Sequence, residues 1–340
     1  MPLQWRGVMA YNVLPSNPLK KALSVRVLIT GAAGFVGSHL RAHLQSTAPY
    51  VQLYGITLAP LPTTEGMAWR TLDLRDADAT AQCLADVQPE QVYHLAGQAS
   101  VDVSFKDTWA TFEANVLATH NLLSACRLLP TPPRVLVVTS AEIYGAVRPQ
   151  DLPVTEETPL RPTNPYSVSK ASQDLLAQQV FFTYGLPVLR ARPFNHLGVG
   201  QSEMFVATAF AMQIARIEAG LQEPILRVGN LNAERDFTNV RDIVRAYALL
   251  MAHGKAGEAY NIASGQTRSI RTLLDTLLGL SSAQIAVEQD PARLRPSDTP
   301  VIFASCQRLH EATGWRPMHT FEQTLREVLD DCRRRVQTQA

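Results

Sequence analysis

The chain has 340 residues, of which 46% are apolar and 18% charged, so it can bury a large core and is not a disordered segment. Its length exceeds the ~100–200 residues of a common domain and predicts one large α/β unit with an attached lobe, or two intimate domains. The formal net charge of +1 gives no broad field for nucleic acid or a membrane surface, and no apolar run approaches the ~18–20 residues of a membrane span. Small anionic ligands remain possible, because these need only a few local arginines.

The four cysteines lie far apart in the sequence and form no C-x-x-C pair. A disulfide framework or a zinc site needs closer or more numerous thiols. We therefore expect reduced cysteines, no metal and a cytoplasmic protein. Residues 1–23 contain prolines and a lysine pair but no continuous apolar stretch. They predict a loose extension and make a poor signal peptide.

From residue 25 onward, short apolar runs typical of strands alternate with longer segments of helical periodicity. Strands are predicted at 25–30, 51–57, 91–95, 134–139 and 186–191, and helices at 35–44, 77–87, 108–128 and 166–184. Apolar strands that alternate with helices predict a parallel sheet covered on both faces, which is a Rossmann-like, doubly wound α/β fold.

After about Pro193 this rhythm loosens, and helical patterns are separated by short strands and proline-rich loops. Later helices are predicted at 205–219, 240–251, 270–278 and 321–336. The pattern indicates a cofactor domain in front and a smaller C-terminal α/β substrate lobe behind. The predicted boundaries are 24–195 with a return segment at about 236–254 for the cofactor domain, and 196–235 and 255–338 for the lobe.

A glycine-rich turn directly follows the first strand and opens the first helix, with Gly31, Gly34 and Gly37 in a G-x-x-G-x-x-G spacing. Glycines permit a tight turn, and backbone N–H groups at a helix N-terminus favour a pyrophosphate. The turn, with Phe35 and Val36, is therefore a candidate dinucleotide site. A plain glycine turn without a ligand is the alternative.

The end of the second strand bears on the choice of cofactor. NAD-preferring sites usually carry an acidic residue there, but residues 54–59 read YGITLA. No carboxylate would repel a 2′-phosphate and no arginine would bind it, so the preference leans only slightly to NADP(H), with NAD(H) possible. Further candidates are Asp73 and Leu74 at the adenine end, and Leu95, Ala96 and Gly97 along the cofactor. Solvated turn residues are the alternative for both groups.

Tyr166 and Lys170 stand four residues apart, which places them on the same face of the helix that should begin after Asn164. A phenol with a pKa of ~10 exchanges protons poorly at neutral pH, and a nearby ammonium favours its ionised form. Ser140 follows the strongest strand and could hold a substrate oxygen against Tyr166. Glu142 could act as a second acid/base, bind a substrate hydroxyl or lie on the surface.

These motifs, GAAGFVG, HLAG, TSAEIYG and NPYSVSK, occur in the order found in the extended short-chain dehydrogenase/reductases, and the chain resembles their nucleotide-sugar epimerase/dehydratase group. Residues 192–201, 228–231, 235–237 and 294–298 are similar to the GDP-mannose branch of that group. The resemblance implies reduction of the C4 ketone of GDP-4-keto-6-deoxy-D-mannose by NAD(P)H, which yields GDP-6-deoxy-D-mannose (GDP-D-rhamnose).

The resemblance also implies roles for individual residues. Tyr166 would be the general acid/base, Lys170 would tune it and hold the nicotinamide ribose, and Ser140 would orient the carbonyl. The remaining implied contacts are Pro193 to the cofactor, Asn195 near the substrate phosphates, Arg235 and Arg295 to the diphosphate and, less securely, Arg227 to the substrate. Surface arginines in loops are the alternative for Arg235 and Arg295, and a structural role at a strand end is the alternative for Arg227.

Other reactions remain open. A 4,6-dehydratase would use Glu142 to remove the C5 proton, but Ser140 stands where that enzyme usually has threonine. The loop after His196 also lacks the arginine-rich turn typical of the dehydratase. Epimerases and other nucleotide-sugar reductases are further alternatives, and a cofactor sensor without catalysis is disfavoured because Ser140, Tyr166 and Lys170 are all present. The segments 108–128 and 166–184 carry more apolar surface than one face of the domain needs. The resemblance implies that they pair into a four-helix interface, so we expect a homodimer; the alternative is that this apolar surface packs on the sheet.

Overall fold

The computed structural model describes residues 24–61, 66–293 and 299–339. The extension predicted at 1–23 lies outside these residues, and so does the 294–298 motif with Arg295.

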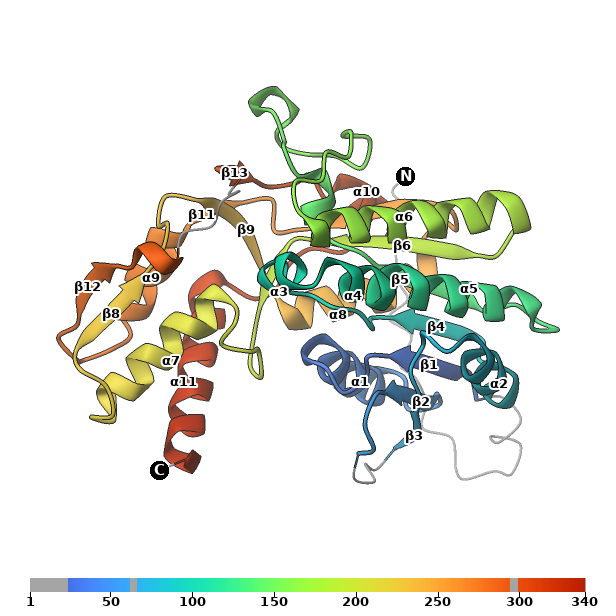
Figure 1. Ribbon diagram of the computed structural model, residues 1–340, viewed down its shortest axis with the longest axis horizontal. Helices are drawn as coiled ribbons and strands as arrows, with labels where there is room; N and C mark the ends of the chain where they lie inside the picture. Colours follow the sequence, from blue (N-terminus) through green and yellow to red (C-terminus); the bar gives the residue numbers. More distant parts are fainter. Residues whose placement is uncertain (1–23, 62–65, 294–298, 340) are drawn as a thin grey trace, which may run out of the picture.

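The large sheet contains seven parallel strands within the described part of the chain, in the order β10-β6-β5-β4-β1-β2-β3 (Figure 1). The strands are β1 (Arg26–Thr30), β2 (Gln52–Thr57), β3 (Met67–Thr71), β4 (Gln91–His94), β5 (Arg134–Val138), β6 (Val188–Pro193) and β10 (Ala259–Ile262). The predicted doubly wound α/β fold is confirmed. β3 was not predicted, because it is an edge strand in which only Met67 is buried.

Helices cover both faces of this sheet. The sheet helices are α1 (Phe35–Thr47) and α8 (Val240–His253) on one face, and α2 (Ala77–Val87), α5 (Ala118–Leu128) and α6 (Pro165–Tyr184) on the other. Along β1, Val27 and Ile29 belong to the hydrophobic core on the face of α1 and α8, and Leu28 belongs to the core on the face of α2, α5 and α6. Alternate side chains thus enter opposite cores, which explains the unbroken apolar run at 27–29.

The segment predicted as one helix at 108–128 is not uniform. It consists of α4 (Thr108–Phe112), a π-helical turn at Glu113–Leu117 and α5, and the short α3 (Val101–Lys106) precedes it. A π turn widens the helix locally and often marks a functional site.

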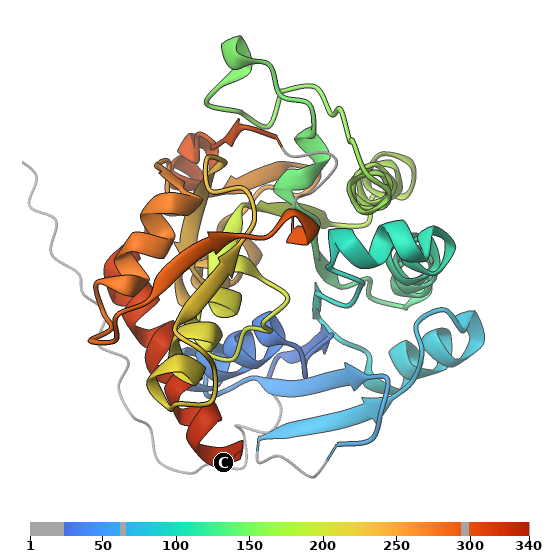
Figure 2. The same ribbon diagram turned by 60° about the vertical axis from the view of Figure 1, so that its left-hand side comes forward.

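The smaller C-terminal lobe builds a separate core from short strands and three amphipathic helices (Figure 2). Its strands are β7 (Asn195–Leu197), β9 (Glu234–Asn239), β11 (Thr267–Ser269) and β13 (Val301–Ile302) in one sheet, and β8 (Ile225–Val228) and β12 (Ala286–Gln289) in a parallel pair. Its helices are α7 (Val206–Glu218), α9 (Ile270–Leu278) and α11 (Phe321–Gln339), and 3₁₀ turns occur elsewhere at Ala141–Tyr144, Pro149–Asp151 and Pro291–Arg293.

The two lobes are more interlaced than the predicted boundaries. The segment 255–338 was assigned to the substrate lobe, but β10 pairs with β6 in the large sheet and α10 (Gln307–Thr313) packs on α8. Conversely, most of β9 falls inside the predicted return segment, yet it belongs to the small sheet. Backbone pairing decides both placements, and these strands are too short to reveal their partners in the sequence. Among the described residues, no helix is long and apolar enough to cross a membrane.

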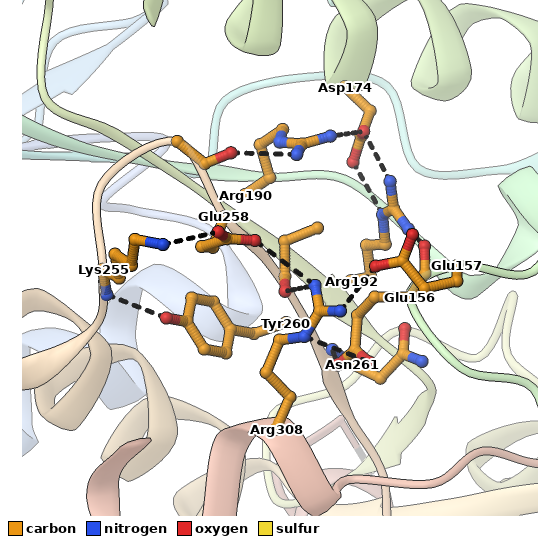
Figure 3. A network of polar contacts seen from close by, with 12 residues as sticks. Glu156, Glu157, Asp174, Arg190, Arg192, Lys255, Glu258, Tyr260, Asn261 and Arg308 are labelled. Atoms are coloured by element: carbon orange, nitrogen blue, oxygen red, sulfur yellow. Dashed lines mark hydrogen bonds and ion pairs between the residues drawn. The ribbon is translucent and has the colours of Figure 1, made fainter. Parts of the chain in front are cut away.

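A buried ionic cluster ties α6 to the edge of the large sheet (Figure 3). The Asp174 carboxylate is fully buried and lies 2.8 Å from both Arg190 Nη1 and Arg192 Nη2. Burial would raise the pKa of Asp174, but the guanidiniums of Arg192 and Arg190 outweigh it and hold the pKa below its usual range. Glu156 extends the cluster, because its carboxylate lies 3.8 Å from Arg308 Nε. The cluster joins α6, β6 and α10 through paired charges.

Candidate active site

The glycine turn between β1 and α1 leaves almost no space for side chains. Gly31 has a φ of +67°, and a Cβ there would lie 2.8 Å from the Ala96 backbone nitrogen. A Cβ on Gly37 would lie 2.3 Å from the Gly31 carbonyl oxygen. Helix α1 begins at Phe35, and no side chain caps it at Gly34. The exposed amides of this first turn and the missing side chains fit the pyrophosphate of a dinucleotide.

A 3₁₀ turn after β5 presents Ser140 and Glu142. Ser140 is the N-cap of this turn, and its Oγ accepts a hydrogen bond of 3.2 Å from the Glu142 amide. The carboxyl ends of β1, β4 and β5 lie at the same edge of the sheet. This turn therefore lies at the same edge as the glycine turn.

Tyr166 and Lys170 are fixed by the start of α6. Asn164 and Ser167 form a reciprocal capping box, and Pro165 occupies the first helical turn. Burial raises the pKa of Tyr166 to about 12 against the lowering effect of its hydrogen bond with Ser140, and the Glu142 carboxylate raises it further. The phenol is therefore protonated at neutral pH and can donate a proton.

Lys170 lies one turn further along the helix. Burial lowers the pKa of Lys170 to about 8, because a charge is costly to remove from water. Its Nζ donates to the Val138 carbonyl at 3.2 Å and to Gln173 Oε1 at 2.9 Å.

The π turn brings Asn115 to the same place, a residue that the sequence analysis did not identify. Its Oδ1 accepts from the Gln98 amide at 2.8 Å, and its Nδ2 donates to Ser169 Oγ at 2.8 Å. A Cβ on Gly97 would lie 2.5 Å from Asn115 Oδ1 and 3.7 Å from Lys170 Nζ. Asn115 has no distinct signal in the sequence, because other polar residues such as Glu113 and Asn121 occur in the same segment and the helical periodicity hides the π turn.

A cavity of about 360 Å³ joins these elements at the carboxyl edge of the sheet. The predicted residues that line it are Gly31, Gly34, Phe35, Val36, Gly37, Leu95, Gly97, Ser140, Glu142, Tyr166, Lys170, Pro193 and Asn195. Residues that the sequence analysis did not assign also line it, among them Gln98, Ser100, Gln201, Met204, Phe205 and Tyr247. Gln201 lies in the glycine motif after His196, whereas Tyr247 comes from α8 and gives no local signal in the sequence.

Five predicted residues do not line this cavity within the described structure. Ala96 packs beneath Gly31, and Leu74 lies in the hydrophobic core. The Asp73 carboxylate pairs with Arg75, which holds the pKa of Asp73 below its usual range.

The other two predicted residues that do not line the cavity are arginines of the smaller C-terminal lobe. Arg227 is half-exposed on β8 and pairs with Glu223 at 2.8 Å. Arg235 donates to the Thr299 carbonyl at 2.6 Å.

Together, the parallel sheet, the glycine turn, the partly buried Ser140 and the buried Tyr166 and Lys170 define a nicotinamide-dependent enzyme of the extended short-chain dehydrogenase/reductase class. A sequence model described as GDP-mannose 4,6 dehydratase matches residues 28–328, and the chain belongs to that family.

Individual relatives narrow the comparison. The chain is 39% identical over 315 residues to GDP-6-deoxy-D-mannose reductase of Pseudomonas aeruginosa, covering 92% of this chain and 99% of that one. It is 28% identical to GDP-mannose 4,6-dehydratase sdnI of Sordaria araneosa, covering 88% of this chain and 60% of the relative. Among solved structures, RMD from Pseudomonas aeruginosa complexed with NADPH superimposes with a TM-score of 0.80 at 38% identity, covering 92% of this chain and all of the other.

Proposed function

We propose that this enzyme reduces the C4 ketone of GDP-4-keto-6-deoxy-D-mannose with NAD(P)H, giving GDP-6-deoxy-D-mannose (GDP-D-rhamnose). One observation carries the proposal: the chain is 39% identical to a reductase of that name over nearly the whole length of both proteins. The cavity supports it, because a buried, protonated Tyr166 and a cationic Lys170 face a turn suited to a dinucleotide.

The chain supplies binding, orientation and a proton. When bound, the nicotinamide cofactor provides the hydride. The glycine turn and the N-terminus of α1 would hold the pyrophosphate, and Lys170 would hold the ribose. Ser140 Oγ and Tyr166 Oη then fix the substrate carbonyl oxygen, and Tyr166 donates its proton as negative charge develops there. The Lys170 ammonium stabilises the resulting phenolate. The burial of Tyr166 keeps water from competing for this proton.

NADPH is the proposed cofactor, with NADH as the weaker alternative. β2 ends at Thr57 and is followed by Leu58 and Ala59, so no carboxylate opposes a 2′-phosphate there. The similar structure complexed with NADPH supports this preference. Comparison of kcat/KM for the two cofactors tests it, and a higher value with NADH contradicts it.

Glu142 supports dehydration as the second candidate, because its position on the cavity wall suits a base that removes the C5 proton. In that reaction the enzyme would convert GDP-mannose without net consumption of cofactor. The lower identity to the dehydratase ranks this candidate second.

The decisive experiment offers both substrates in parallel: GDP-4-keto-6-deoxymannose with NADPH or NADH, and GDP-mannose with NADP⁺. We expect cofactor oxidation and a 6-deoxy C4 alcohol from the first and no reaction of the second. NMR couplings of the product identify the C4 epimer. Conversion of GDP-mannose to the keto sugar without net cofactor change supports the dehydratase instead. If neither reacts, the GDP-sugar assignment is wrong, and UDP- and dTDP-sugars are the next substrates.

We further propose that the enzyme is a cytoplasmic homodimer. Exposed apolar side chains lie on the neighbouring helices α4, α5 and α6, including Trp109, Leu128, Leu175 and Phe182. Such a patch fits a four-helix interface with a second copy. Light scattering that gives a monomer mass at micromolar concentration contradicts the dimer.

A further inference from the structure

A buried chain of hydrogen bonds connects Lys170 to the cofactor turn. Lys170 Nζ donates to Gln173 Oε1 at 2.9 Å, and Gln173 Nε2 donates to Thr119 Oγ1 at 2.8 Å. Thr119 Oγ1 is also 2.8 Å from His94 Nε2, and His94 Nδ1 is 2.8 Å from Thr30 Oγ1. Gln173, Thr119, His94 and Thr30 are fully buried.

The direction of each hydrogen bond in this chain is determined by its two ends. Thr30 Oγ1 accepts from the Leu95 and Ala96 amides at 3.2 and 3.1 Å, so its own proton is directed to His94 Nδ1. His94 is then the Nε2–H tautomer and donates to Thr119. Burial, together with the charge of Lys170, lowers the pKa of His94 to about 3, so the ring is neutral.

Thr119 determines which way the Gln173 amide faces. Its hydroxyl proton is directed to the Asn115 carbonyl in the π turn, 2.6 Å away. Its oxygen therefore accepts from both His94 and Gln173. Because the Gln173 NH₂ group is held by Thr119, the amide oxygen must face Lys170.

Lys170 is held by a neutral amide, and this has a consequence for its charge. In the described structure, the hydrogen-bond acceptors of Nζ are the Val138 carbonyl and Gln173 Oε1, and no carboxylate pairs with it. Tyr166, Glu142 and Tyr247 line the same cavity. Asp174 follows Gln173 in α6, but it is bound by Arg190 and Arg192 of β6. The lysine charge is thus held in place without being neutralised.

We propose that Gln173 is a positioning residue for Lys170. Its amide, oriented by Thr119, His94 and Thr30, fixes the ammonium beside Tyr166 while leaving its positive charge available to the phenol. This inference deepens the proposed function and rests on it for its catalytic meaning.

Two variants of Gln173 have opposite expected effects. Gln173→Glu places a carboxylate on the ammonium, which raises the pKa of Lys170 and weakens its effect on Tyr166. We expect the alkaline limb of kcat/KM to move to higher pH by about one unit, with about tenfold lower activity at neutral pH. Gln173→Met removes the acceptor, so the limb should move to lower pH. A role limited to packing would leave the alkaline limb of Gln173→Met at the wild-type pH.

A second measurement does not depend on turnover. In protein labelled with ¹³C at lysine Cε, the Lys170 signal, assigned with Lys170→Arg, is titrated in the wild type and in Gln173→Glu. We expect a higher Lys170 pKa in the variant. The control is Gln323→Glu, which adds the same charge at an exposed position where the side chain accepts from the Thr320 amide. It should change neither measurement.

The outcomes separate the two proposals. An unchanged Lys170 pKa and an unchanged pH profile in Gln173→Glu overturn the positioning role, whether or not Gln173→Met folds. A raised Lys170 pKa in an enzyme that does not reduce the keto sugar supports the positioning of the ammonium and contradicts the proposed reaction.

Discussion

Helix α6 contributes to two buried polar clusters, one around Lys170 and one around Asp174, four residues apart. The two clusters differ in whether their central charge is neutralised. On the side of Asp174, one carboxylate is shared by Arg190 and Arg192, and acids and arginines alternate outward from it. On the side of Lys170, a single ammonium rests on a carbonyl and an amide, followed by hydroxyls and a neutral imidazole. Compensated charges hold the sheet edge together, whereas an uncompensated charge can act on Tyr166.

The largest expected effect is on the side of Lys170. Tyr166→Phe removes the proton donor but keeps the ring in its buried position, so kcat for the keto sugar should fall about 10³-fold. NADPH affinity, measured by fluorescence titration, should change little. A variant that retains more than a tenth of the wild-type kcat would show that Tyr166 is not the acid.

The next effect belongs to the ionic cluster. Asp174→Asn leaves two buried guanidiniums around a neutral amide, so the free energy of unfolding should fall by about 3–5 kcal/mol. Urea denaturation followed by circular dichroism measures this change. A loss below 1 kcal/mol would mean that solvent reaches the cluster and that it is not the compensated core described above.

His94 gives the neutral cluster a pH signature. Its pKa is about 3 in the folded protein and about 6.5 when unfolded, so below pH 6.5 the unfolded chain binds a proton that the folded chain does not. The free energy of unfolding therefore decreases as the pH is lowered, by about 2 kcal/mol between pH 6.5 and pH 5. We expect the free energy of unfolding, measured against pH, to decrease over this range by about 2 kcal/mol more in the wild type than in His94→Gln. Parallel curves would place the titrating group elsewhere.

The smallest effect separates the two arginines. Arg192 holds Asp174 through Nε and Nη2 at 2.9 and 2.8 Å, whereas Arg190 uses only Nη1, and its buried Nε lacks a hydrogen-bond partner in the described structure. Arg190→Met should therefore cost only about 1 kcal/mol, less than Asp174→Asn. Equal losses in chemical denaturation would show that Arg190 is as necessary as the carboxylate.

The sequence predicted those elements whose signals are local. The apolar run at 134–139 became β5, and the motifs around Ser140 and Tyr166 came together at one cavity because parallel strands end at the same edge. β3 escaped prediction because its edge position exposes most of its side chains.

Contributions across long distances escaped for a different reason. Tyr247 reaches the cavity from a helix 81 positions after Tyr166, and the Lys170 cluster depends on which strands are neighbours. Arg227 was predicted as a substrate contact, but its side chain on β8 pairs with Glu223. Residue type alone cannot reveal such partners, because tertiary packing determines them.

The position of β10 in the sheet has a consequence for synthesis on the ribosome. β6 is complete at Pro193, but its neighbour β10 begins at Ala259, and α8 lies in the intervening stretch. At 5–20 residues per second, the nascent chain carries an open edge at β6 for roughly 3–13 seconds, and for part of that time it lacks α8 over β5 and β6. During that interval the emerging half is the form most exposed to aggregation, and it is the form that a chaperone would bind.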